Sequence, residues 1–266
     1  MNRLLFLGVG PIAKAVRRAL PALPAAGTTR AAPDQRFVDI QPIAAADLTA
    51  IRAAARDAQV VVSCPPDGNV DRVWSALMSE AASIAYLSST VVYSESAGVV
   101  TEQSAVSTGT ERARMRLGAE QLWQGAGARV VRLPAFYGRT SGLHVSLSRG
   151  TFRMPGAGDN IVSRVHEDDA ARFVCAALRA PPRSLLLAGD DEPSPVAEVV
   201  HFVCALFDLP VPNAVHGEQI PLSLRASRSV DNRATKTAFG VRLAYPNYRE
   251  GYRAIREMAR NSPGVY

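Results

Sequence analysis

Residues 3–20 read RLLFLGVGPIAKAVRRAL, and this stretch decides the fold. Its apolar run at 3–7 stops at a glycine-rich turn, as a buried strand does. Apolar residues then recur at helical spacing from Pro11, and proline suits the first position of a helix. A strand, a tight turn and a helix in immediate succession predict the opening unit of a parallel sheet.

The alternation of strand and helix continues along the chain. We expect a second strand to end in GTTR (27–30), further strands over 59–66, 83–89, 128–134 and 183–189, and helices over 47–58, 70–81, 110–123, 166–178, 194–207 and 247–260. This order predicts an α/β fold, a doubly wound parallel Rossmann sheet with helices on both faces. Residues 138–163 are rich in Gly, Ser and Arg, and we expect them to form loop.

The composition of the sequence changes after residue 134, which suggests that the chain has two structural parts. We expect a dinucleotide-binding Rossmann core over 1–140 and a smaller C-terminal substrate-binding lobe over 141–266, with 163–189 returning to the core. A chain of 266 residues is long enough for one large domain with such a lobe.

Composition argues against several classes of protein. The net charge is +6, but no basic run reaches five residues, which argues against a nucleic-acid partner. No apolar run approaches the length of a membrane span, and Gly8, Gly10 and Pro11 interrupt the first apolar stretch too early for a signal peptide. We therefore expect a cytoplasmic protein without a membrane partner. Its many arginines and alanines suggest a bacterium with a GC-rich genome.

The cysteines and histidines give no sign of a metal site. Cys64, Cys175 and Cys204 are odd in number and far apart, so they do not form a disulfide framework. The histidines lack metal-ligand spacing with any Cys, Asp or Glu cluster. We expect no metal in the site.

The glycine turn fits a known phosphate-binding pattern. Residues 8–13, GVGPIA, match G-x-G-x-x-G/A directly after a strand and at the start of a helix. The glycines allow the backbone to approach a pyrophosphate closely, and the helix N-terminus offers free N–H groups. We expect Gly8, Gly10, Pro11, Ile12 and Ala13 to bind a dinucleotide.

The second strand indicates which dinucleotide. In NAD-binding proteins this strand normally ends with an acid that binds the ribose 2′-hydroxyl, whereas here Arg30 occupies that neighbourhood. A guanidinium pairs well with a phosphate, so the pattern favours NADP over NAD. The alternative is that Arg30 is a solvated loop residue.

Several motifs in order resemble one family. They are GVGPIA (8–13), LSSTVVY (87–93), RLGAEQLW (116–123), RLPAFYGRTSGL (132–143), SRVHEDDAARFV (163–174) and YPNYREGYRAI (245–255). Together these motifs, which run along nearly the whole chain, resemble the extended short-chain dehydrogenase/reductase superfamily, in its NAD-dependent epimerase/dehydratase branch and near its atypical members.

The resemblance implies roles for residues at strand ends. Ser89 matches the family's catalytic Ser/Thr, whose hydroxyl holds the substrate oxygen. Ser88, Cys64, Pro65 and Pro134 are expected beside the cofactor. The alternative is that the hydroxyl residues of 87–93 simply end a strand.

One departure from the family changes the chemistry that we expect of the site. The family's Tyr-x-x-x-Lys pair falls on Arg112 and Arg116, and the two lysines of the chain, Lys14 and Lys236, lie elsewhere. Arg116 can offer positive charge and donors, but arginine does not deprotonate and cannot be a general base.

A proton must therefore come from another group or from water. We expect Tyr93 first, then Tyr137, with His166 more often a structural residue at a helix start. The predicted catalytic set is Ser89, Tyr93, Arg116 and Tyr137.

These patterns predict an NADP-dependent oxidoreductase with an atypical site, acting on a small carbonyl, alcohol or imine. Arginines near the pocket favour an anionic substrate. One alternative is a non-catalytic NADP-binding redox sensor, and another is a sugar-nucleotide epimerase or dehydratase. The identity of the substrate, the direction of reaction and the formation of a homodimer stay open.

Overall fold

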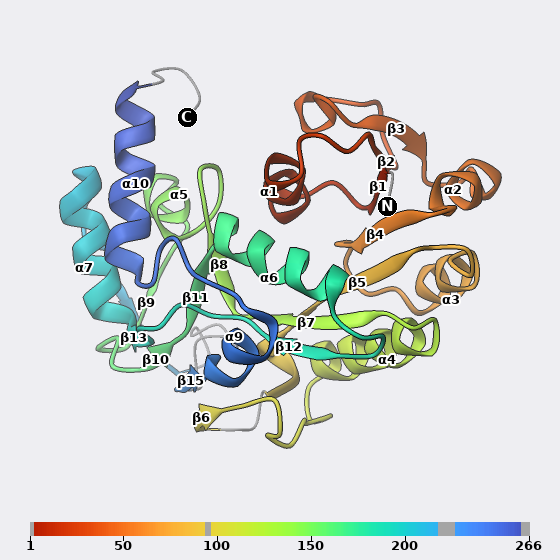
Figure 1. Ribbon diagram of the computed structural model, residues 1–266. Coiled ribbons are helices and arrows are strands. Elements are labelled where there is room, and N and C mark those ends of the chain that lie inside the picture. Colours follow the sequence, from red (N-terminus) through yellow and green to blue (C-terminus); the bar gives the residue numbers. More distant parts are fainter. Residues whose placement is uncertain (1–2, 94–96, 218–226, 262–266) are drawn as a thin grey trace.

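The computed structural model describes residues 3–93, 97–217 and 227–261 (Figure 1). Its centre is a sheet of seven strands in the order β12-β7-β5-β4-β1-β2-β3, and every neighbouring pair is parallel. The strands are β1 (Arg3–Leu7), β2 (Ala25–Thr29), β3 (Gln41–Ala44), β4 (Ala58–Val62), β5 (Ser83–Ser89), β7 (Arg129–Leu133) and β12 (Leu185–Leu187). The predicted Rossmann sheet is confirmed, and its strand order reverses between β1 and β4.

Helices cover both faces of the sheet because successive strand residues point to opposite sides. Leu4 and Phe6 of β1 pack under α1 (Pro11–Ala19) and α6 (Glu167–Arg179). Leu5 and Leu7 pack under the opposite layer. That layer consists of α2 (Leu48–Ala55), α3 (Gly68–Ala76) and α4 (Glu111–Gly125). The carboxylate of Asp47 caps α2 by accepting from the backbone N–H of Ala50 at 2.9 Å.

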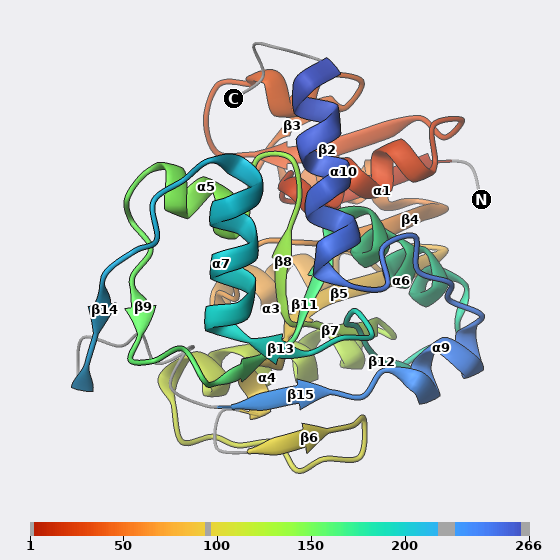
Figure 2. The same cartoon turned by 90° about the vertical axis from the view of Figure 1, so that its left-hand side faces the viewer.

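A second group of elements lies beside the carboxyl end of the sheet (Figures 1 and 2). Its helices are α5 (Leu143–Ser148), α7 (Val196–Phe207) and α10 (Tyr248–Asn261). They share a separate apolar cluster in which the rings of Tyr137 and Tyr252 stack with centroids 4.4 Å apart.

Short elements complete the described chain. They are β6 (Gly98–Val100), β8 (Ala135–Tyr137), β9 (Met154–Pro155), β10 (Ile161–Val162), β11 (Arg164–His166), β13 (Ser194–Pro195), β14 (Ala214–Val215), β15 (Arg228–Val230), α9 (Arg233–Phe239) and the 3-10 turns η1 (Gln35–Phe37) and η2 (Thr90–Tyr93). The chain leaves the core after β7 and returns for α6 and β12. The division at residue 140 stays a prediction, and 218–226 and 262–266 of the predicted lobe lie outside the described residues.

The structure contains elements that the sequence expectations lacked, among them β3 and α5. β3 was not expected, because its sequence, QPIA, is short and contains a proline. Helix α5 lies in the stretch expected to be loop. It begins after Gly142, whose φ of +112° suits glycine, and Leu147 anchors it in the apolar cluster.

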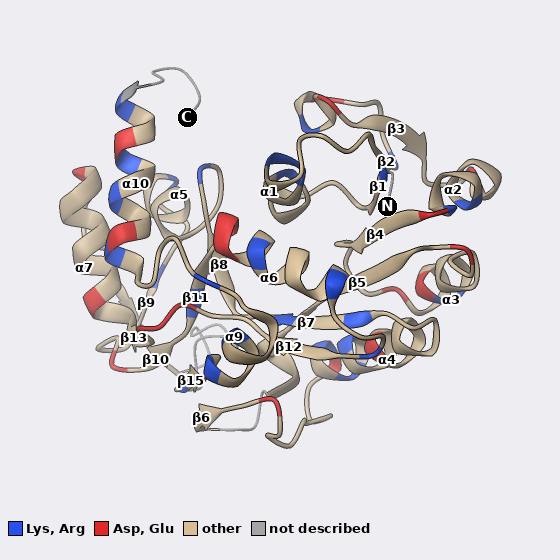
Figure 3. Ribbon diagram, viewed as in Figure 1, with Lys and Arg blue, Asp and Glu red and all other residues tan. Residues whose placement is uncertain are grey.

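Charge is spread over many elements. In Figure 3, basic and acidic residues alternate along α10 and both occur on α6. In the described ranges, no helix combines the length and the apolar character that crossing a bilayer requires.

Candidate active site

Residues that follow six parallel strands meet at one edge of the sheet and line two cavities, each of about 550 Å³. The first is lined by Gly10, Pro11, Ile12, Ser63, Cys64, Pro65, Pro66, Leu87, Ser88, Ser89, Val91, Arg112, Met115, Arg116, Leu133, Pro134 and Phe136. We call it the Ser89 cavity. The second is lined by Gly8, Thr28, Thr29, Arg30, Ala45, Ala46, Leu48, Cys64, Pro65, Pro66, Asp67, Asn69, Val70, Val73 and Trp74. We call it the Arg30 cavity. The two share Cys64, Pro65 and Pro66, so they adjoin.

The glycine turn lies between the cavities, and its first glycine is required by the backbone. Gly8 has a φ of +91°, and a Cβ there would lie 3.1 Å from the backbone nitrogen of Cys64. The N–H of Gly8 donates to Thr28 Oγ1 at 2.9 Å, and Ser63 Oγ donates to the carbonyl of Gly8 at 2.5 Å. These contacts join the ends of β1, β2 and β4.

The second glycine leaves the start of α1 open. A Cβ at Gly10 would meet nothing within 4 Å, and no side chain caps the helix. The first N–H groups of a helix lack partners inside it, so they are free to bind an anion here. Ile12 lines the cavity as expected, but Ala13 does not, because it is buried against α6.

Arg30 lies at the mouth of its cavity. It is exposed and forms no ion pair within the described ranges, whereas nearby Arg36 is held by Asp34 at 2.8 Å. Leu48 and Val73 give the cavity an apolar wall. A flat ring could rest there with an anionic group near the guanidinium of Arg30.

The two neighbouring serines at the end of β5 have different hydrogen bonds. Ser89 Oγ accepts from the N–H of Val91 at 3.2 Å, so its proton is free to donate into the cavity. Ser88 also lines the cavity, but its hydroxyl donates to the Glu120 carboxylate beneath. Pro134 and Phe136 form part of the wall as the chain leaves β7.

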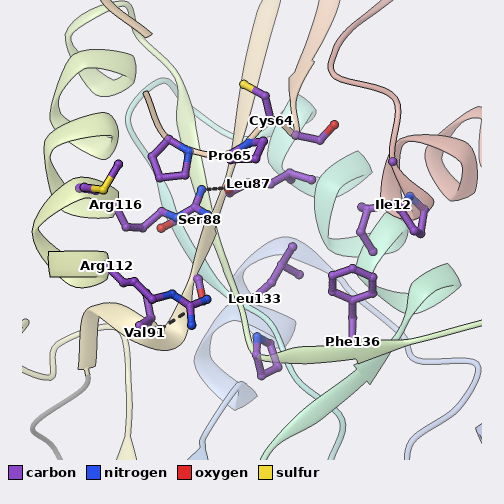
Figure 4. A pocket seen from close by; sticks show the side chains of 17 residues that line it. Ile12, Cys64, Pro65, Leu87, Ser88, Val91, Arg112, Arg116, Leu133 and Phe136 are labelled. Carbon is purple, nitrogen blue, oxygen red and sulfur yellow. Dashed lines mark hydrogen bonds between the residues drawn. The ribbon is translucent and has the colours of Figure 1, made fainter. Parts of the chain in front are cut away.

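Arg112 and Arg116 project from α4 into the Ser89 cavity and face Ile12 and Phe136 across it (Figure 4). Arg116 Nη1 donates to the carbonyl of Leu87 at 3.1 Å and to the hydroxyl of Tyr86 at 3.0 Å. These bonds hold the guanidinium at the end of β5.

A buried network lies below the cavity. Arg132 on β7 donates to Glu120 Oε1 at 3.0 Å and Oε2 at 2.7 Å, and it also donates to the hydroxyl of Tyr93 at 2.7 Å. Tyr93 in turn donates to the carbonyl of Thr101 at 3.2 Å. The side chain of Tyr93 is fully buried and lines neither cavity, so the structure corrects its expected place beside the substrate.

The other expected proton donors also lie outside the cavity lining. Tyr137 packs on Tyr252, and burial raises the pKa of its hydroxyl well above the usual value. Burial lowers the pKa of His166 to about 4, and its Nδ1 caps α6 by accepting from the N–H of Asp168 at 3.2 Å. Tyr137 does not line the Ser89 cavity, because alternation along β8 turns Phe136 to the cavity instead.

The Ser89 cavity contains few groups that exchange protons. Among its described lining residues none is Asp, Glu, His, Lys or Tyr. Burial raises the pKa of the Cys64 thiol to about 11, so this thiol stays protonated at neutral pH. Sequence reasoning missed Phe136, Met115 and the Glu120 network. A charged residue within the apolar strand ARVVRLP was the signal available for the network, because a buried charge needs a partner.

Comparison with known proteins gives related folds. No protein-family model matches the chain. A conserved protein of unknown function from Silicibacter pomeroyi is 28% identical over 97% of this chain and 99% of its own, with a TM-score of 0.82. MoeE5, solved with UDP-glucose and NAD, is 17% identical over 98% of this chain and 99% of its own, also with a TM-score of 0.82.

A curated relative matches a shorter region. The 3-diazoavenalumate denitrifying reductase of a Streptomyces species is 26% identical over 123 residues, which are 43% of this chain and 40% of that protein. The chain therefore has the fold of the extended short-chain dehydrogenases/reductases and NAD-dependent epimerases/dehydratases, as its motifs indicated.

Proposed function

We propose that this chain is an oxidoreductase that binds a nicotinamide dinucleotide across the two cavities and reduces a small substrate in the Ser89 cavity. The observation that carries the proposal is the pair of adjoining cavities with the open turn at Gly10 between them. A dinucleotide has two halves joined by a pyrophosphate, and the uncapped start of α1 suits that pyrophosphate.

The chain's residues divide between the two halves. Leu48 and Val73 would pack against the adenine, and Arg30 would bind a ribose 2′-phosphate. Pro134 and Phe136 would border the nicotinamide. When bound, the cofactor supplies a hydride. Arg30 supports NADP, although MoeE5 was solved with NAD.

We take reduction as the direction, over epimerisation or dehydration. Neither Arg112 nor Arg116 can exchange the reacting proton, so this proton must pass through water whichever way the reaction runs. The Ser89 hydroxyl can donate to a carbonyl oxygen or imine nitrogen while water delivers the proton through the open cavity. The name of the curated relative, a reductase, agrees with this direction.

The proposal is tested by titrating the folded protein with NADPH and with NADH while nucleotide fluorescence is followed. We expect saturable binding of NADPH, and loss of that binding in Gly10→Val, whose side chain would fill the turn. A folded protein that binds neither nucleotide would sink the proposal.

Turnover separates an enzyme from a sensor. We expect loss of absorbance at 340 nm when NADPH is mixed with members of a carbonyl and imine panel, and a lower kcat in Ser89→Ala. Tight NADPH binding without turnover of any panel member would instead favour the alternative function, a non-catalytic redox sensor.

A further inference from the structure

We propose that Arg112 and Arg116 bind a carboxylate on the substrate, so that the Ser89 cavity accepts an apolar body with one anionic end. The inference rests on the proposed function, since it names the substrate class for the same site. It comes from the charge and polarity of the cavity wall.

The wall carries two positive charges and no negative one. Arg112 and Arg116 are its charged members, and no Asp or Glu is among its described lining residues. Arg112 is exposed, and its guanidinium has no ion pair or hydrogen bond to the described residues. Two guanidinium groups without acidic partners create a positive potential that attracts an anion.

The geometry suits a planar anion. Arg112 and Arg116 are one turn apart on α4 and extend into the same cavity (Figure 4). Nη1 of Arg116 is committed to Leu87 and Tyr86, which fixes the plane of its guanidinium. Its other N–H groups remain for an acceptor. Guanidinium groups bind carboxylates through paired hydrogen bonds, which gives both orientation and strength.

The rest of the wall disfavours a sugar. Ser63 donates its hydroxyl to Gly8, and Ser88 donates to Glu120, so neither hydroxyl proton is free for a ligand. Apart from Ser89 and the two arginines, the remaining wall is largely apolar, with Leu87, Val91, Met115, Leu133 and Phe136 among its members. A sugar needs many hydrogen-bond partners, whereas an aromatic or aliphatic carboxylate needs an apolar surface and one anion site.

The test compares two ligands of matched shape. The protein is first saturated with NADP⁺ and then titrated, by calorimetry, with 4-hydroxycinnamate or its neutral amide. We expect the carboxylate to bind about 10- to 100-fold more tightly than the amide, as charge-assisted hydrogen bonds imply.

Variants assign the effect to the arginines. Arg112→Gln should abolish the preference for the carboxylate, and Arg112→Lys should keep part of it. Arg114→Gln is the matched control. It lies on the same helix but lines neither cavity, and its guanidinium donates to the carbonyl of Thr108 at 2.7 Å. This control should keep the full preference.

The outcomes separate this inference from the proposed function. Failure of both NADPH and NADH to bind would remove the proposed function and this inference together. Normal NADPH binding with equal affinity for carboxylate and amide, or with no binding of either up to its solubility, would overturn the inference alone. So would a loss of NADPH affinity in Arg112→Gln with the ligand preference unchanged, because the arginine would then belong to the cofactor site.

Discussion

Arg132 on β7 donates two hydrogen bonds, of 3.0 and 2.7 Å, to the carboxylate of Glu120 on α4, in the interior beneath the Ser89 cavity. Both side chains are largely buried. The pair joins the sheet to the helix that carries Arg112 and Arg116, so it supports the wall of the cavity without touching a ligand.

We expect Glu120→Gln to lower the free energy of unfolding by about 3–5 kcal/mol, because it leaves the buried charge of Arg132 without a counter-ion. Urea denaturation followed by circular dichroism measures the change. The control is Glu80→Gln, whose exposed ion pair with Arg56 should contribute less than about 1 kcal/mol. Equal losses of unfolding free energy in the two variants would show that the buried pair stabilises the fold no more than the exposed pair does.

Substitution at the two glycines of the turn should separate stability from binding. Gly8→Ala should destabilise the fold by about 1–2 kcal/mol, because its φ of +91° disfavours a side chain and Cys64 is close. Gly10→Ala should keep the melting temperature, since its Cβ meets no protein atom, and should weaken NADPH binding. Thermal melts and nucleotide titrations measure the two effects. A stable Gly8→Ala would contradict the first expectation.

Arg30 should determine the choice of nucleotide. We expect Arg30→Ala to weaken NADPH binding about 10- to 100-fold and to leave NADH binding unchanged, because the 2′-phosphate alone loses a charged partner. Fluorescence titration gives both dissociation constants. Arg36→Ala is the control, since Arg36 is held by Asp34 and lines neither cavity. Equal changes for the two nucleotides in Arg30→Ala would rule out a 2′-phosphate contact.

Asp190 should make stability depend on pH. It is 1% exposed, and burial raises the pKa of its carboxyl to about 8, with Arg164 opposing the shift. Between about pH 4, the usual value for an aspartate, and pH 8, the folded state holds a proton that the unfolded state releases. The stability from this group is therefore complete at low pH and falls as pH rises, by up to about 1.4 kcal/mol per pH unit.

Asp190→Asn should remove this fall, because the amide stays neutral at every pH. Denaturant unfolding of both proteins from pH 4 to pH 8 gives the free energy of unfolding as a function of pH. The contribution of His166 has the opposite sign, but it is the same in both proteins and cancels in the difference between their slopes. Exposed Asp159, changed to Asn, serves as the control and should keep the wild-type slope. Parallel curves for wild type and Asp190→Asn would contradict the expectation.

Local patterns predicted the core and the turn well. Gly8 and Gly10 could be placed because a strand, a turn and a helix follow one another within 17 residues, from Arg3 to Ala19. The resemblance placed Ser89, Cys64 and Pro65 at the site. All three line the Ser89 cavity because Ser89 ends β5 and the other two follow β4, and the ends of parallel strands meet at one edge.

The expected proton donors were misplaced for local reasons. The turn η2 after β5 takes the Tyr93 ring to Arg132, and no sequence period reports the direction of such a turn. Tyr137 and Phe136 are neighbours on a strand of three residues, which is too short for alternation to be recognised in the sequence. The partner of Arg132 depends on tertiary packing between β7 and α4, which local sequence does not report.

The packing of α1 on α6 has a consequence for biosynthesis. Arg18 and Glu167, which form an ion pair at 2.9 Å across these helices, are 149 positions apart in the chain. The apolar side of α1, including Ile12 and Val16, is covered by α6 in the finished molecule. Until the ribosome has made α6, that side of α1 lacks this cover. The glycine turn at Gly8 and Gly10 therefore reaches its final support only after a helix far along the chain has been synthesised.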